Sequence, residues 1–227
     1  MHGERRRTRP QGWLPRLLTA CACSALAFAN PAAIQRHPGL EGVDEALRFI
    51  RTSTPAERAR FNREYRVLVG RPPVDYLEVV TPFRAVVLAG SARAAAGDRS
   101  FGQRLALELL KGMGDTVAVH AELTFHPFNT FIGVPPYTVH LMHRGTRDTL
   151  PPRDVRLLSR FTPRSESLPV VPPPLLPTPS PGAQLLGATV VATFDLAGLD
   201  ARGDYDVVVA LEGKDASRSL VQMGLLR

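Results

Sequence analysis

The stretch VAVHAELTFH, residues 117–126, alternates apolar and polar side chains and decides how the rest of the chain is interpreted. Its odd-numbered members are all apolar, whereas His120, Glu122 and His126 fall on the other side. A period of two is typical of a β-strand with one face in a core and the other in solvent. The stretch therefore predicts a half-buried strand.

The same alternation recurs further along the chain. It is found in residues 137–141, 155–161, 188–196 and 205–211, and a last strand is expected near residues 220–225. Six short half-buried strands favour an antiparallel sandwich over a parallel sheet, because the strands of a parallel sheet are apolar on both faces. We therefore predict that residues 113–227 form an antiparallel β-sandwich.

Residues 30–112 have a different character, in which helical signals dominate. Apolar residues recur at three- and four-residue spacing after Gly39, and Thr54 and Thr81 each form an N-cap signal with a following proline. We expect helices at residues 43–50, 55–65 and 82–97 and a strand at 76–80, with a strand that continues through residues 85–88 as the alternative to the third helix. Residues 101–113 fit either state. The predicted fold class is mainly β with an α-helical N-terminal portion.

Residues 199–205, LDARGDY, place a leucine, a turn glycine and a tyrosine directly before an alternating strand. This arrangement resembles the tyrosine corner of immunoglobulin-like sandwiches, in which the tyrosine hydroxyl is hydrogen-bonded to the backbone a few residues upstream. The resemblance implies an immunoglobulin-like sandwich with Tyr205 at the corner. It implies no activity, since such sandwiches carry many unrelated functions.

The N-terminal segment has the three parts of a secretory signal peptide. Arginines up to Arg9 precede an apolar stretch at residues 17–29, and Ala27 and Ala29 are the small residues of a cleavage site. We expect residues 1–29 to be removed on export, to the periplasm or the extracellular space.

Both cysteines, Cys21 and Cys23, lie in this segment. Cleavage after Ala29 leaves a mature chain without cysteine, which excludes thiol catalysis and cysteine-ligated zinc from it. In the alternative interpretation, residues 18–21 form a lipobox and Cys21 carries a lipid that anchors the protein.

Basic residues outnumber acidic ones, with 28 Lys and Arg against 21 Asp and Glu. Much of the excess lies in the predicted signal peptide, and no run of basic residues follows Arg7. The charge pattern of a nucleic-acid-binding protein is therefore absent from the sequence. We expect no nucleic-acid partner, and membrane contact only through the signal peptide or a lipid on Cys21.

Proline occupies eight of the positions in residues 163–181. Such a run lacks donors for sheet hydrogen bonds and favours an extended connection. We predict a long proline-rich loop between two strands of the sandwich; a docking peptide for an aromatic groove is the alternative.

Histidines are concentrated in one window of the sequence. His120, Glu122 and His126 share a strand face if the strand stays regular, and His140 is available from a neighbouring strand. Imidazole and carboxylate are good zinc or copper ligands, so a three-ligand site is one hypothesis. Because Pro127 ends the strand beside His126, we expect scattered side chains, with no metal and no cofactor.

The connection between the strands at 117–125 and 137–141 is the most distinctive part of the chain. It gathers aromatic side chains with His126, Asn129 and Tyr137 around several prolines. Rigid loops of this composition at the end of a sandwich commonly form binding surfaces. In the alternative interpretation, Phe125 and Phe131 fill the core while His126 and Asn129 bind loop backbone.

None of the common nucleophile, phosphate-loop, dinucleotide or zinc-protease motifs occurs in the sequence. We therefore expect an exported, non-enzymatic binding, structural or accessory module of a bacterial cell envelope, with an unidentified envelope protein or glycan as partner. The candidate binding residues are His126, Asn129, Tyr137, His120, Glu122 and His140. The alternative function is a metal-dependent periplasmic enzyme that uses His120, His126 and His140.

Overall fold

The computed structural model describes Ile34, residues 38–161 and residues 184–227. The predicted signal peptide, the lipobox alternative and the proline-rich loop lie outside the described residues.

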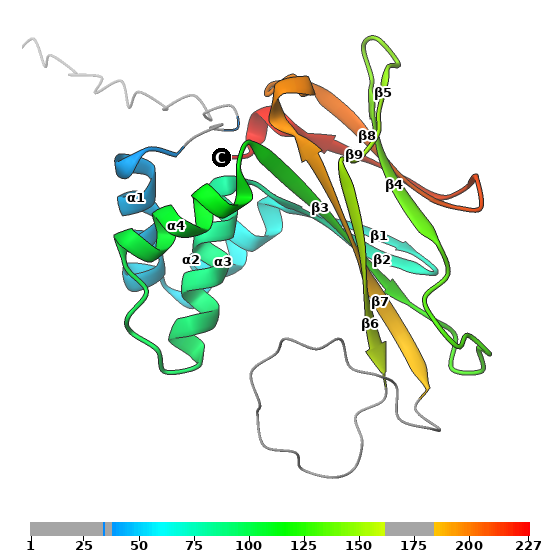
Figure 1. Cartoon of the computed structure of the whole chain (residues 1–227), viewed down its shortest axis with the longest axis horizontal. Helices are drawn as coiled ribbons and strands as arrows, with labels where there is room; N and C mark the ends of the chain where they lie inside the picture. The colour runs from blue at the N-terminus through cyan, green and yellow to red at the C-terminus, as the bar shows by residue number, and fades with distance from the viewer. Residues whose placement is uncertain (1–33, 35–37, 162–183) are drawn as a thin grey trace, which may run out of the picture. The chain divides into compact units, whose positions relative to one another are not determined.

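The strands form two antiparallel sheets (Figure 1). The five-stranded sheet has the order β1 (Arg66–Arg71), β2 (Val74–Val80), β3 (Thr116–Thr124), β7 (Leu185–Asp195) and β6 (Asp154–Phe161). The four-stranded sheet has the order β5 (Thr149–Leu150), β4 (Tyr137–His143), β8 (Asp204–Leu211) and β9 (Lys214–Gln222). The prediction of a mainly β protein with antiparallel sheets is confirmed.

The main core lies between the two sheets. The apolar side of β3 is fully buried, as the period of two predicts, and Val139 and Leu141 of β4 are equally inaccessible. Phe194 of β7 and Val207 and Val209 of β8 complete the centre of this cluster. Removal of this apolar surface from water is the main stabilising contribution to the sandwich.

Three strands at sheet edges differ from the sequence prediction. The structure contains β1 and the two-residue β5, neither of which was predicted, and β9 begins at Lys214, with residues 223–225 forming a 3-10 turn. In β1 the outward-facing Leu68 is apolar and exposed, and β9 is mostly polar, so neither strand shows the apolar alternation. In β8 the outward-facing Asp206 and Val208 are also buried, although the alternation predicts exposure for Asp206.

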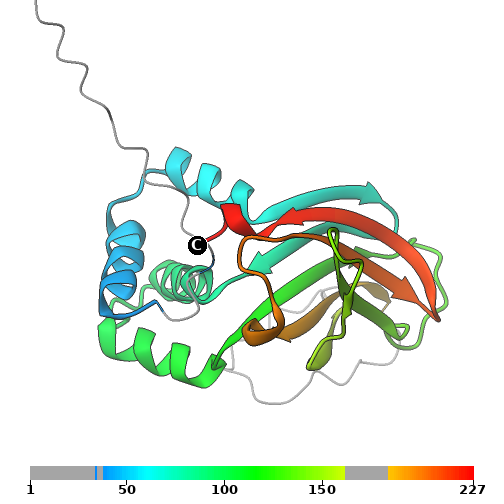
Figure 2. The same cartoon turned by 90° about the horizontal axis from the view of Figure 1, so that it is seen from above.

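Four helices come from the N-terminal half of the described chain: α1 (Leu40–Thr52), α2 (Pro55–Glu64), α3 (Pro82–Ala95) and α4 (Gln103–Met113). Figure 2 shows them gathered at one end of the strands. Thr54 forms a capping box with Glu57, and Thr81 caps α3 through the Arg84 N–H. The ambiguous stretch 101–113 is mostly helical. Within the described residues, no helix has both the length and the apolarity needed to cross a membrane.

The helices have their own small core, which is joined to the sandwich by a buried ion pair. Val43, Phe83 and Val86 are central to the helical cluster. Beside this cluster, Arg84 of α3 is 1% exposed and Glu78 of β2 is 6% exposed. Arg84 Nη2 lies 2.6 Å from Glu78 Oε1. The pair therefore links the first helix after β2 to the five-stranded sheet.

Tyr205 occupies the position that the corner resemblance predicts. It lies near the start of β8, and its hydroxyl oxygen accepts a hydrogen bond of 2.7 Å from the Asp200 N–H. The side chain is buried, and the His143 ring lies against it with the ring centroids 5.1 Å apart. The local prediction of a hydroxyl bonded back to the upstream backbone is confirmed.

Tyr205→Phe is expected to lower the free energy of unfolding by about 1 kcal/mol, because the Asp200 N–H loses its partner while the ring stays in the core. Urea denaturation of the two proteins measures this difference. An unchanged midpoint would show that the hydroxyl does not stabilise the corner.

Candidate functional site

The loop between β3 and β4, residues 125–136, crosses from the five-stranded sheet to the four-stranded sheet. Polar side chains hold its backbone. Asn129 Nδ2 donates to the carbonyl oxygens of His126, at 2.8 Å, and of Leu185, at 2.9 Å, while its Oδ1 accepts from the Phe131 N–H at 3.1 Å. His126 Nδ1 accepts from the Phe128 N–H at 3.2 Å. The loop is therefore fixed internally and to the start of β7.

The core side of this loop is aromatic. Phe125 is buried, its ring stacks on Tyr137, and Phe131 contacts it edge-on with the ring centroids 5.2 Å apart. Tyr137 is 5% exposed and belongs to the core. Of the interpretations offered by the sequence, the structural role holds for Phe125, His126 and Asn129. It is wrong for Phe131, which does not fill the core because its side chain is 43% exposed.

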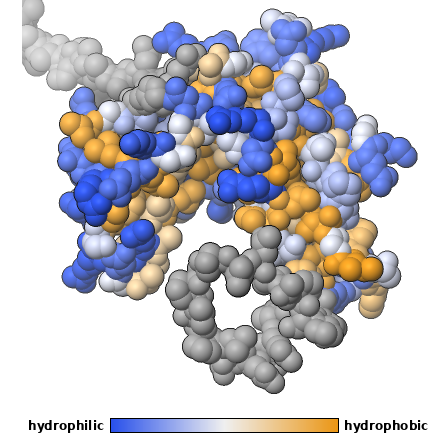
Figure 3. Space-filling view, in the orientation of Figure 1, coloured by the Kyte–Doolittle hydropathy of each residue, from blue (hydrophilic) through white to orange (hydrophobic). Residues whose placement is uncertain are grey.

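The outer side of the loop is apolar and open to solvent. The side chain of Phe128 is 87% exposed and that of Ile132 is 94% exposed, while Phe131 is partly exposed between them. Figure 3 shows hydrophobic side chains on the surface at this end of the sandwich. We call Phe128, Phe131 and Ile132 the apolar tip. A rigid loop that carries an exposed apolar group is typical of an interaction surface.

The histidines that are close together in the sequence lie apart in the fold. His120 and Glu122 lie on the outer face of the five-stranded sheet, on β3. The expectation that His140 comes from a strand neighbouring β3 is wrong, because β4 pairs with β5 and β8 in the other sheet. His126 lies beyond the end of β3, in the loop. Within the described part of the chain, no group of three or more His, Cys, Asp or Glu side chains is placed to hold a metal ion.

Glu122 serves the sheet itself. Its carboxylate lies 2.8 Å from Arg160 Nη1 of β6 and accepts a hydrogen bond of 2.6 Å from the Thr189 hydroxyl of β7. Three neighbouring strands are thus joined across their outer face. The ion pair and the hydrogen bond give Glu122 a structural role in the five-stranded sheet, rather than a role in metal binding or catalysis.

His120 lies opposite Glu78 of β2 in the strand register. Burial of the imidazole lowers its pKa from the ordinary value of 6.5, and the nearby carboxylates of Glu78 and Glu122 oppose that effect only in part. The folded protein therefore holds His120 neutral at pH 7.

This lowered pKa makes the protein sensitive to mild acid. Below about pH 6.5 the unfolded chain binds a proton at His120 that the folded chain does not, so stability falls until the pH reaches the lower folded pKa. Unfolding midpoints measured from pH 7 to pH 5 should fall less steeply in His120→Gln than in the natural protein. Parallel curves would contradict this assignment.

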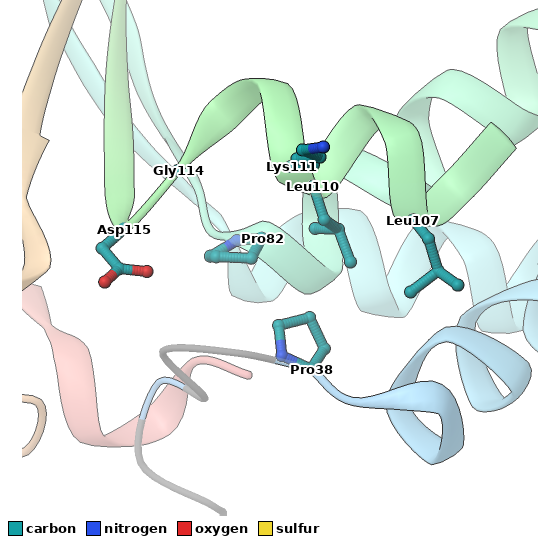
Figure 4. A pocket seen from close by; sticks show the side chains of 7 residues that line it. All are labelled: Pro38, Pro82, Leu107, Leu110, Lys111, Gly114 and Asp115. Carbon is teal, nitrogen blue, oxygen red and sulfur yellow. The ribbon is translucent and has the colours of Figure 1, made fainter. Parts of the chain in front are cut away.

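A small hollow of about 250 Å³ lies in the helical part, where the end of α4 meets the start of α3 (Figure 4). Leu107 and Leu110 point into it from α4, and Pro38 lies on the facing side. Ligand sites usually add several convergent polar groups to an apolar lining. The apolar tip is the stronger candidate for a binding site, because its backbone is fixed by hydrogen bonds and its side chains are exposed.

Comparison of the chain with protein-family models, with curated proteins and with solved structures finds no match in any of the three.

Proposed function

We propose that the protein is an exported, non-enzymatic module of a bacterial cell envelope, built on an immunoglobulin-like sandwich, that binds another protein through the apolar tip. The observation that carries the proposal is the exposure of Phe128 and Ile132 on a loop whose backbone is fixed by Asn129 and His126.

The strand order supports the immunoglobulin-like assignment. If β2 is taken as strand A and the strands are lettered along the chain with β5 as C′, the larger sheet without β1 has the order A-B-E-D. The smaller sheet then has the order G-F-C-C′. Immunoglobulin-like sandwiches combine an A-B-E-D sheet with a C-F-G sheet and place the tyrosine corner at the start of strand F. Tyr205 near the start of β8 fits that position.

The same lettering makes the apolar tip the B–C loop. In immunoglobulin variable domains, the B–C and F–G loops lie at the end that binds antigen. This is an analogy of fold, and a fold alone does not determine function. The exposed apolar side chains of the tip are the independent support for a binding role.

The chemistry of the tip favours a protein over a glycan. Sugar binding needs hydrogen-bonding groups beside the aromatic ring, yet the Asn129 amide is used by His126, Leu185 and Phe131. The side chains that the tip exposes to solvent are the hydrocarbon groups of Phe128 and Ile132. Such side chains serve as anchors when they enter an apolar pocket on another protein, and a prebuilt loop lowers the entropy cost of binding.

Site-specific photo-cross-linking in the producing cells tests the proposal. A photoreactive amino acid at position 128 should give one adduct with another protein, and Ile132→Asp in the same chain should abolish it. The matched control is position 68 on β1, where Leu68 is 83% exposed. The same adducts from both positions, a self-adduct of two copies, or a protease-resistant glycan adduct would each contradict the proposal.

Export has a separate test. N-terminal sequencing of the exported protein should begin at Asn30, as the predicted cleavage site requires. A start at Met1 would contradict cleavage, and a lipid-modified Cys21 would replace it with the lipoprotein alternative.

A further inference from the structure

We propose a second binding site on the four-stranded sheet, in which Arg144, Arg147 and Arg218 bind a phosphate group. It does not depend on the apolar tip, because it lies at the opposite ends of the strands: Arg144 and Arg147 follow the last residue of β4, whereas the tip precedes its first.

The strand register brings these side chains together from three strands and one turn. Met142 of β4 pairs with Asp206 of β8, and Arg218 of β9 pairs with Val208, two residues further along β8. The turn after β4 adds Arg144 and Arg147. Together with His143, these residues line a hollow of about 460 Å³: Met142, His143, Arg144, Arg147, Asp206 and Arg218.

The side chains that line this hollow carry a net positive charge. Three guanidinium groups line it with a single carboxylate, that of Asp206, whose Oδ1 lies 2.8 Å from Arg144 Nε. This pairing engages only Nε and leaves the two terminal nitrogens of Arg144 for another acceptor. Within the described residues, Arg147 has no side-chain hydrogen bond or ion pair, and Arg218 has one, with Asp215 at 3.0 Å.

The turn that carries Arg147 is held in an unusual conformation. Arg147 has a φ of 62°, the left-handed region that non-glycine residues seldom occupy. The Arg147 N–H bonds to the His143 carbonyl at 2.8 Å, and the Arg144 N–H bonds to the Asp204 carbonyl at 3.0 Å. Strained backbone of this kind is concentrated at binding sites, where the surrounding structure maintains it. A glycine would form the turn more easily, so the arginine side chain is the feature that needs explanation.

Arginine groups that converge on an open hollow suit an oxyanion, because each guanidinium can donate two parallel hydrogen bonds. A phosphate group has enough oxygens for all three side chains. The opening to solvent allows the phosphate to belong either to a small soluble molecule or to a lipid headgroup.

Titration with inorganic phosphate and with glycerol phosphate, followed by NMR of the arginine N–H groups, tests the site. We expect saturable shifts at Arg144, Arg147 and Arg218, and at least about tenfold weaker binding in Arg218→Gln, the effect of losing one charge-assisted contact. The matched control is Arg153→Gln, which removes the same charge from an exposed arginine paired with Asp195. Equal weakening in the control, or no saturable shift together with no binding to phosphatidylglycerol vesicles, would overturn the proposal.

Arg147→Gly separates binding from folding. Glycine adopts a positive φ without strain, so this variant should melt at a higher temperature than the natural protein and still lose phosphate binding. Retained binding in the stabilised variant would overturn the role of Arg147. Co-sedimentation with phosphatidylglycerol vesicles, compared with phosphatidylcholine vesicles, then identifies the source: binding that only the vesicles show assigns the phosphate to a lipid headgroup, and binding of glycerol phosphate alone assigns it to a soluble molecule.

Discussion

Arg84→Ala is expected to lower the free energy of unfolding by about 3 kcal/mol, because the buried Glu78 carboxylate loses one of its two arginine partners and keeps only Arg66, whose Nε lies 2.9 Å from Oε2. Arg84 Nε and Nη2 both donate to Glu78 Oε1, and Nη1 donates to Asn62 Oδ1 at 2.6 Å. The guanidinium also lies 5.1 Å from the ring centroids of Phe61 and Tyr65. The truncation therefore removes an ion pair and aromatic packing where α2, α3 and β2 meet.

Chemical denaturation measures this loss, with Arg104→Ala as the control. Arg104 also forms a short ion pair, with Glu108 at 2.6 Å, but both side chains are largely exposed and the pair should contribute only a few tenths of a kcal/mol. The double variant Arg84→Met with Glu78→Gln should be more stable than Arg84→Ala, since no charge is left buried. Equal midpoints for Arg84→Ala and Arg104→Ala would contradict the importance of this junction.

Gly187→Ala is expected to cost about 3 kcal/mol, at the upper end of what overpacking costs. Gly187 lies on β7 opposite Thr124 of β3. A β-carbon there would lie 2.1 Å from the Leu123 carbonyl oxygen, and this backbone atom cannot move without shifting β3. β3 is the middle strand of the five-stranded sheet and β7 lies beside it, so the shift disturbs the whole sheet.

The matched control for this change is Gly112→Ala on α4. A β-carbon at Gly112 meets nothing within 4 Å, and alanine favours the helix, so this variant should be stabilised by about 0.5–1 kcal/mol. Thermal unfolding of both variants should therefore give shifts of opposite sign. A Gly187→Ala protein as stable as the natural one would show that the close approach of β3 and β7 is not required.

The central strands were predictable because their side chains must alternate between a core and an outer face. β3 has this pattern in full, and the structure buries its apolar side completely. The strands β1 and β9 were not predictable in this way, because the exposed apolar Leu68 breaks the alternation in β1 and β9 is mostly polar. Asp206 was misplaced because its burial depends on Arg144, which reaches it from a turn outside β8.

The candidate site was predictable in location but not in detail. The density of aromatic residues and prolines between β3 and β4 indicated the loop, and the roles of His126 and Asn129 as backbone partners were among the interpretations. Tyr137 is buried and Phe128 is exposed because of where the loop turns. The residue types alone do not specify the positions of these turns. No local pattern in the sequence indicates the arginine hollow, because Arg218 lies more than seventy positions from Arg144 and only the strand register brings them together.

Cysteine accessibility in the producing cells tests most directly whether a partner covers the apolar tip. In a chain with Cys21 and Cys23 replaced by serine, single cysteines are introduced at Ile132 and, as the control, at Leu68, since both side chains are highly exposed. In the purified protein, both cysteines should react with a maleimide at similar rates. In intact cells, we expect position 132 to be protected while position 68 still reacts; equal reaction at both positions would contradict the account.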